Sequence, residues 1–210
     1  RRAGGVASGP VSFMRIWDAM CATLLSTAAR RGAMMGTLRC DHPDIEAFID
    51  AKRDARELRN FNLSVLVSDD FMQAVEQGAD WPLVFPDASL QPDTGAETLM
   101  RAWPGQAGEV SCRVIARRPA RALWQRIMRA AYETAEPGVL FVDRINALNN
   151  LYYREHIATT NPCGEVPLPA FGACDLGSIN LAAAVSAPFS AAAAIDHGHL
   201  GRLSAVAVRF

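Results

Sequence analysis

Two hydrophobic spacings alternate along the chain, and this alternation is the feature that most constrains the fold. Apolar residues three and four apart predict a core-facing helix over residues 11–30 and another helix over residues 120–133. An alternating, β-branched run predicts a strand at residues 61–67, and a short apolar run predicts a buried strand at residues 138–142. Helices and strands in this order indicate an α/β architecture with largely parallel strands.

Short polar residues predict where some of these elements begin. Ser8 or Ser12 is expected to cap the first helix, and Ser68 is expected to cap a helix that follows the strand at residues 61–67. Asp44 is predicted to lie near the positively polarised start of a short helix. His42 and the acidic residues around it allow a metal site, but a solvated helix start is the favoured interpretation.

Residues 81–112 are rich in Pro, Gly, Asp and Gln, which predicts a long surface excursion within one domain. Trp103 and Cys112 are expected to serve local packing there.

Composition narrows the class of protein. Half of the residues are apolar, and 21 Lys and Arg face 22 Asp and Glu, so no basic excess predicts a nucleic-acid surface. No apolar run is long enough to predict a membrane span. The five cysteines are unclustered, which is typical of a reducing cytoplasm. The first residue is not Met and the last residues read as a helix interior, so we expect a piece of a longer chain.

The pentad Asn161-Pro162-Cys163-Gly164-Glu165 is the strongest candidate site. Proline fixes φ and glycine turns freely, so the pentad is expected to form a shaped loop. Residues two apart in an extended backbone point to the same side, which lets Asn161, Cys163 and Glu165 face one ligand. These side chains offer a hydrogen-bonding amide, a thiol for radical or nucleophilic chemistry, and a carboxylate that can take a proton.

Spacing alone leaves other interpretations of Cys163 open. The thiol could be a small buried hydrophobe in a turn. A zinc site is disfavoured, because the chain contains no C-x-x-C and His156 is the one histidine near the pentad. A Cys–His protease pair with His156 lacks an evident oxyanion hole or orienting partner.

The wider sequence resembles the active-site loop of ribonucleotide reductase large subunits, and most of all their class II, adenosylcobalamin-dependent branch. The resemblance rests on T-T-N-P-C-G-E-V-P-L-P at residues 159–169 and F-G-A-C-D-L-G-S-I-N-L at residues 171–181. It extends over residues 4–210 and is tightest at 30–44, 137–150 and 159–181. It implies part of a ten-stranded α/β barrel, with the active-site cysteine on a central finger loop at residues 159–181.

The resemblance also implies roles for the loop residues. Cys163 becomes a thiyl radical that removes the 3′ hydrogen of a ribonucleotide, Glu165 takes the 3′-hydroxyl proton, and Asn161 orients the sugar. Cys174 supplies one of two thiols that reduce the intermediate, and the other is expected upstream of residue 1. A thioredoxin-like or dithiol reductant then restores the thiols. The implied radical source is adenosylcobalamin, and the separate diiron subunit of class I enzymes is the alternative.

Regulation is implied at the start of the chain. Residues 4–40 resemble the region that forms a homodimer and holds a deoxynucleotide effector. The stretch that resembles the loop between effector and substrate base consists of Arg30, Arg31, Gly32, Ala33 and Met34. Arg31 and Met34 are the candidate relay residues. Without the resemblance, two arginines and a glycine after a helix predict an ordinary C-cap.

A different class of function stays open, namely an inactive nucleotide-binding or regulatory remnant. The intact Asn161, Cys163, Glu165 and Cys174 argue against long decay. The piece by itself is expected to complete no turnover and to have poor stability, because strand edges and core faces are left uncovered.

Overall fold

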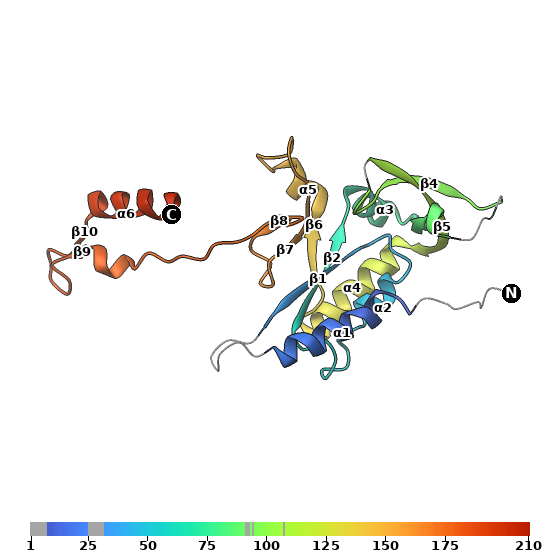
Figure 1. The fold of residues 1–210 in the computed structure, drawn as a ribbon, viewed down its shortest axis with the longest axis horizontal. Coiled ribbons are helices and arrows are strands. Elements are labelled where there is room, and N and C mark those ends of the chain that lie inside the picture. The colour runs from blue at the N-terminus through green and yellow to red at the C-terminus, as the bar shows by residue number, and fades with distance from the viewer. Residues whose placement is uncertain (1–7, 25–31, 91–92, 94, 107) are drawn as a thin grey trace. The chain divides into compact units, whose positions relative to one another are not determined.

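In a computed structural model of the protein, all residues are described except 1–7, 25–31, 91–92, 94 and 107 (Figure 1). The chain divides into two compact units, Arg1–Gly172 and Ala173–Phe210, and each is described by itself.

A parallel sheet forms the centre of the first unit. It contains β1 (Met34–Arg39), β2 (Phe61–Val67) and β6 (Gly138–Phe141) in the order β1-β2-β6. The strand prediction at residues 61–67 is confirmed. The second strand prediction is wrong in two respects: Val142 already belongs to α5 (Val142–Ala147), and β6 is exposed at both ends. Among the described strands β6 pairs with β2 alone, so it is an edge strand, and few other residues cover it.

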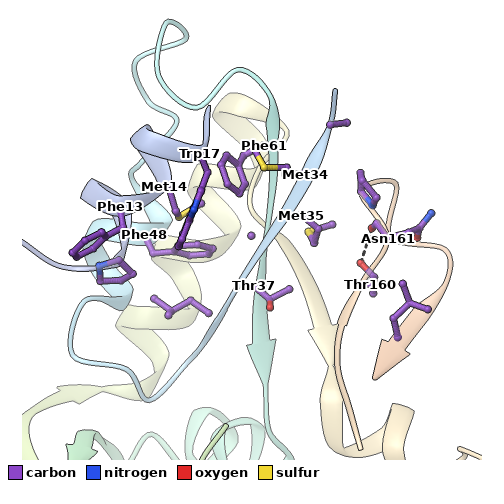
Figure 2. Close-up of a pocket in the computed structure, with 16 residues that line it drawn as sticks. Phe13, Met14, Trp17, Met34, Met35, Thr37, Phe48, Phe61, Thr160 and Asn161 are labelled. Carbon is purple, nitrogen blue, oxygen red and sulfur yellow. Dashed lines mark hydrogen bonds between the residues drawn. The ribbon is translucent and has the colours of Figure 1, made fainter. Parts of the chain in front are cut away.

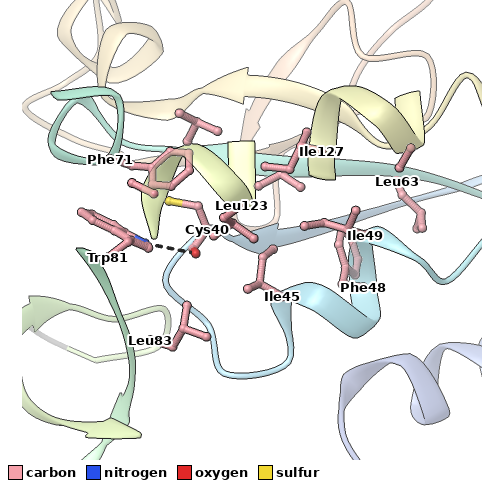
Figure 3. Packing of buried hydrophobic residues seen from close by; sticks show 14 of the residues in the cluster. Cys40, Ile45, Phe48, Ile49, Leu63, Phe71, Trp81, Leu83, Leu123 and Ile127 are labelled. Carbon is pink, nitrogen blue, oxygen red and sulfur yellow. Dashed lines mark hydrogen bonds between the residues drawn. The ribbon is translucent and has the colours of Figure 1, made fainter. Parts of the chain in front are cut away.

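Three helices complete the core of this unit. They are α2 (Ile45–Ile49), α3 (Asp69–Gln77) and α4 (Ala120–Thr134). The helix prediction for residues 120–133 is confirmed, and so is the Ser68 cap, whose side chain accepts a hydrogen bond from the Phe71 N–H at 3.2 Å. Asp44 precedes α2 as predicted. Figure 3 shows the core residues packed together, among them Phe48, Leu63, Phe71, Leu123 and Ile127.

Helix α1 (Pro10–Thr23) differs from its prediction. It ends seven residues before residue 30, and residues 25–30 lie outside the described ones. Neither serine caps it, since Gly9 occupies the N-cap and the Ser12 hydroxyl donates to the Ser8 carbonyl at 2.8 Å. Met14 is its one fully buried residue. The core-facing prediction is therefore wrong for most of its apolar positions, which are 49–65% exposed in this chain: Phe13, Ile16, Trp17 and Met20 of α1, and Leu24 at its C-cap.

The stretch predicted as a surface excursion contains a three-stranded sheet, and its described residues between 87 and 111 are exposed or half-buried. Strands β3 (Asp80–Pro86), β4 (Thr98–Ala102) and β5 (Glu109–Pro119) pair antiparallel in the order β3-β5-β4, with the short helix η1 (Asp87–Ser89) after β3. Sequence reasoning missed these strands, because proline-rich sequence disfavours a central strand, whereas β3 is an edge strand and tolerates Pro82 and Pro86. Trp81 and Leu83 are buried.

The remaining pairs of strands are also antiparallel. A hairpin joins β7 (Ile157–Thr160) to β8 (Pro167–Pro169). The prediction of largely parallel strands therefore holds only for β1-β2-β6, although the α/β class is confirmed. Within the described residues the barrel is not closed, because this parallel sheet has three strands.

The second unit is small. It contains η2 (Leu181–Ala184), the paired strands β9 (Val185–Ser186) and β10 (Ala194–Ile195), and α6 (His197–Arg209). Asp196 caps α6 by accepting from the His199 N–H at 2.8 Å. Across the part of the chain that the structure describes, we find no helix with the length and apolar character of a membrane span.

Candidate active site

The pentad forms the tight turn between β7 and β8. The Asn161 N–H donates to the Val166 carbonyl at 3.1 Å, and the Gly164 N–H donates to the Asn161 carbonyl at 3.0 Å. The Asn161 side-chain oxygen accepts from the Val166 N–H at 3.0 Å. Gly164 has φ +86°, a conformation that glycine adopts without strain. The predicted shaped loop is confirmed.

The turn leaves its two reactive side chains in the open. Cys163 and Glu165 are exposed, and Asn161 is half-buried. The interpretation of Cys163 as a buried hydrophobe is therefore wrong. A compact turn does not keep the alternation of an extended strand, so a common ligand face for the three side chains stays a prediction. Asn161 uses its side-chain oxygen within the turn, while its amide NH₂ donates to no other described group.

Two further side chains hold the hairpin at β7. The Asn146 amide donates to the Ile157 carbonyl at 2.9 Å and accepts from the Ile157 N–H at 2.8 Å, so it pairs with the backbone as a strand would. The Thr37 hydroxyl donates to the Ala158 carbonyl at 3.3 Å, which ties β1 to β7. Sequence reasoning missed both, although Asn146 lies in the tightly matching stretch 137–150.

A cavity of about 770 Å³ lies beside the turn. Figure 2 shows residues of α1, β1 and the turn around it, including Phe13, Trp17, Met34, Met35 and Asn161. Its volume falls in the range of small-molecule pockets. The structure thus brings Met34, from the predicted specificity loop, to the same cavity as Asn161.

Gly36 in β1 gives the cavity part of its shape. A Cβ at this position would lie 2.6 Å from the terminal methyl of Met14, so the absence of a side chain lets α1 approach the strand.

The rest of the predicted specificity loop is only partly described. Arg30 and Arg31 lie outside the described residues. Gly32 lies against the end of α1, where an added Cβ would be 2.3 Å from the Cys21 sulfur. Ala33 is exposed and lines the cavity with Met34. The effector role of these residues stays a prediction.

Cys174 belongs to the second unit. It is exposed and lies in a stretch without regular secondary structure, with its thiol 4.0 Å from the Asp175 carbonyl oxygen. All five cysteines are free. Cys40 and Cys112 are buried, and burial raises the pKa of the Cys40 thiol to about 12.

His42 does not lie at a solvated helix start, so that interpretation is wrong. Its side chain is 12% exposed and packs near Phe85 and Trp103, with ring centroids 5.6 and 6.3 Å away. Its Nδ1 accepts from the Asp44 N–H at 3.0 Å. Burial lowers the pKa of His42. Within the described ranges, no three His, Cys, Asp or Glu side chains are grouped to hold a metal ion.

Comparison with known proteins agrees with this architecture. The family model described as "Ribonucleotide reductase, barrel domain" matches residues 1–210. A vitamin B12-dependent ribonucleoside-diphosphate reductase of Mycobacterium tuberculosis (strain CDC 1551 / Oshkosh) is 40% identical over 208 residues, which is 99% of this chain and 26% of the relative. One of Thermoplasma acidophilum is 39% identical over 178 residues, covering 84% of this chain and 20% of the relative.

A third relative extends the range of organisms. The vitamin B12-dependent ribonucleotide reductase of Streptomyces clavuligerus is 34% identical over 202 residues, covering 85% of this chain and 19% of that protein. The chain thus spans about a quarter or less of these relatives' length. Because the family model matches every residue, the chain belongs to the ribonucleotide reductase barrel-domain family.

Proposed function

We propose that this chain carries the radical cysteine of a ribonucleotide reductase and that it acts as part of a longer protein. The reaction converts a ribonucleotide to a 2′-deoxyribonucleotide for DNA synthesis. The observation that carries the proposal is the exposed Cys163 and Glu165 on one tight turn beside a ligand-sized cavity, in a chain of this family.

The chemistry follows from the groups on the turn. As a thiyl radical, the sulfur of Cys163 removes the 3′ hydrogen atom of the ribose and later returns it. The Glu165 carboxylate takes the 3′-hydroxyl proton, which promotes loss of the 2′-hydroxyl as water. The amide NH₂ of Asn161 is free of partners among the described residues and can hold the sugar in a reactive geometry.

The reaction needs two electrons, and thiols can supply them. Two thiols lose two hydrogen atoms and form a disulfide, while the ribonucleotide becomes a deoxyribonucleotide and water. Cys174, exposed and free, is our candidate for one of these thiols. A dithiol or thioredoxin-like protein would then reduce the disulfide. Free cysteines are typical of the cytoplasm, where we place the reaction.

Adenosylcobalamin is the radical source that we propose, because the three relatives are named as vitamin B12-dependent. The exposed thiol of Cys163 on the turn can be reached by such a cofactor. When bound, the cofactor supplies the radical that removes the thiol hydrogen atom.

Regulation and assembly are further parts of the proposal. Ala33 and Met34 line the cavity that Asn161 also lines, so a bound effector could influence through them which base the substrate site accepts. The exposed apolar face of α1, defined by Phe13, Ile16, Trp17, Met20 and Leu24, suits the same helix of a second copy.

The test is deoxyribonucleotide formation by the intact longer protein with adenosylcobalamin and a dithiol. A ribonucleoside diphosphate is the first substrate to assay, since two relatives are named for it. We expect Cys163→Ala to abolish turnover, because no other group on the turn can accept and return a hydrogen atom. We expect Glu165→Gln to lower kcat by about 100- to 1,000-fold, the usual scale of general base catalysis.

The matched control is Cys112→Ala, which removes a buried thiol remote in sequence from the turn. It should retain turnover. Activity that is independent of cobalamin but lost in Cys163→Ala would assign a different radical source to the same site. An intact protein that is inactive with every radical source would favour the nucleotide-binding remnant instead.

A further inference from the structure

Asn62 connects the parallel sheet to the turn that carries Cys163. It lies in β2, opposite Met35 of β1. Its neighbours Phe61 and Leu63 are buried, whereas Asn62 is exposed, as expected when successive residues of a strand face opposite sides. Its side-chain NH₂ donates to the carbonyl of Pro162 at 2.5 Å. Pro162 is the residue directly before Cys163.

This hydrogen bond differs from the others around the hairpin. The bonds of Asn161, Gly164 and Val166 are internal to the turn. The bonds from Thr37 and Asn146 end on the β7 strand, before the turn begins. Within the described part of the chain, Asn62 is the one residue outside the hairpin whose side chain bonds to the turn.

The bonded carbonyl belongs to the peptide group between Pro162 and Cys163. Proline fixes its own φ, so the orientation of this peptide depends mainly on the ψ angle of Pro162. A donor held by a sheet strand fixes the carbonyl and therefore the orientation of this peptide. The peptide plane in turn sets the direction in which the Cys163 side chain leaves the turn.

We propose that Asn62 is a positioning residue for Cys163, acting through the Pro162 carbonyl. The role rests on the proposed function, in which the Cys163 sulfur must meet one ribose hydrogen. Hydrogen transfer depends steeply on geometry, and a misplacement of about 1 Å can cost on the order of 100-fold in rate. By bonding to the Pro162 carbonyl, Asn62 fixes the position of the Cys163 sulfur relative to the parallel sheet.

The test compares side chains at residue 62 in the intact protein. Asn62→Asp keeps the shape and replaces the donor with an oxygen that repels the carbonyl. We expect kcat for deoxyribonucleotide formation to fall about 10- to 100-fold, while KM for the ribonucleotide changes by less than about twofold. Asn62→Gln keeps an amide donor and should recover part of the loss. The control Gln73→Ala removes an exposed amide on α3 and should leave kcat unchanged.

A second measurement requires no turnover. Hydrogen exchange of the substrate-free protein reports on the Gly164 and Val166 amides, whose bonds close the turn. Loss of a tethering hydrogen bond should speed their exchange about fivefold in Asn62→Asp. Exchange in α4 should not change, because α4 makes no bond to Asn62.

The outcomes separate this role from the proposed function. A wild-type protein without reductase activity would disprove the proposed function. The exchange measurement would still test whether the hydrogen bond from Asn62 holds the turn. Wild-type kcat in Asn62→Asp, or unchanged exchange in the turn, overturns the positioning role. A higher KM with unchanged kcat also overturns it, since Asn62 would then bind substrate.

Discussion

At the scale of single residues, burial gives cysteines of this chain different chemistry. Cys40 directly follows β1 and is 2% exposed, and its pKa of about 12 keeps the thiol protonated at neutral pH. Cys163 lies on a turn and is exposed. A thiol that reacts with a substrate must be reachable, so exposure decides which cysteine can act.

The lowered pKa of His42 makes the free energy of unfolding depend on pH. Burial lowers its pKa most strongly, Arg39 adds to the effect, and Asp44 and Asp41 oppose it. The folded protein therefore binds this proton less readily than the unfolded chain, whose histidine pKa is about 6.5. Above that pH both states are neutral and stability is unaffected. Below it, the free energy of unfolding should fall as the pH falls.

The variant His42→Asn removes the titrating group and keeps a side chain able to accept the Asp44 N–H. We expect the thermal midpoint of the wild type to drop more than that of the variant between pH 7.5 and pH 5. Scanning calorimetry at both pH values measures this. Equal drops in the two proteins would show that burial of His42 does not govern this pH range.

At the scale of elements, Glu136 links the segment that leads into β6 to β2 and to Lys52. Its carboxylate accepts from the Leu63 N–H at 2.8 Å and from the Lys52 ammonium at 2.6 Å. Lys52 also donates to the Phe61 carbonyl. The side chains of the ion pair are only 18% and 21% exposed, so water replaces these bonds poorly.

We therefore expect Glu136→Ala to lower the free energy of unfolding by about 2–3 kcal/mol, because an ammonium and a backbone N–H lose their partner. The matched control is Glu133→Ala on α4. Glu133 is 46% exposed and faces Arg53 at 3.7 Å, so its loss should cost within about 0.5 kcal/mol. Urea unfolding measures both, and similar costs for the two variants would contradict the bridging role.

At the scale of the whole molecule, α1 presents an apolar face that this chain does not cover. Ile16 is 64% exposed, and Met20, four residues later on the same helix face, is 49% exposed. Exposed apolar faces of this kind mark contacts with other protein surfaces. The proposed contact is the same helix of a second copy.

The variant Ile16→Glu tests that contact in the intact protein. Burying an isoleucine contributes about 1.5–3 kcal/mol, so introducing a carboxylate should raise the dimer dissociation constant by at least about tenfold. Light scattering across a concentration series measures it. The variant Arg15→Gln is the control, because it changes the neighbouring residue, whose side chain pairs with Glu57 at the surface and is not part of the apolar face. A dimer that tolerates Ile16→Glu would exclude this face as the contact.

The sequence by itself determined the elements whose signals are local. The strand at residues 61–67, helix α4, the Ser68 cap and the turn at Cys163 follow from spacing, capping and the φ preferences of proline and glycine. The tertiary structure alone decided what depends on partners distant in the chain. An edge position made a strand of the proline-rich β3, and Asn62 meets Pro162 across 100 residues. Local patterns specify which side chains are apolar or polar, but burial and long-range hydrogen bonds depend on which surfaces the fold brings together.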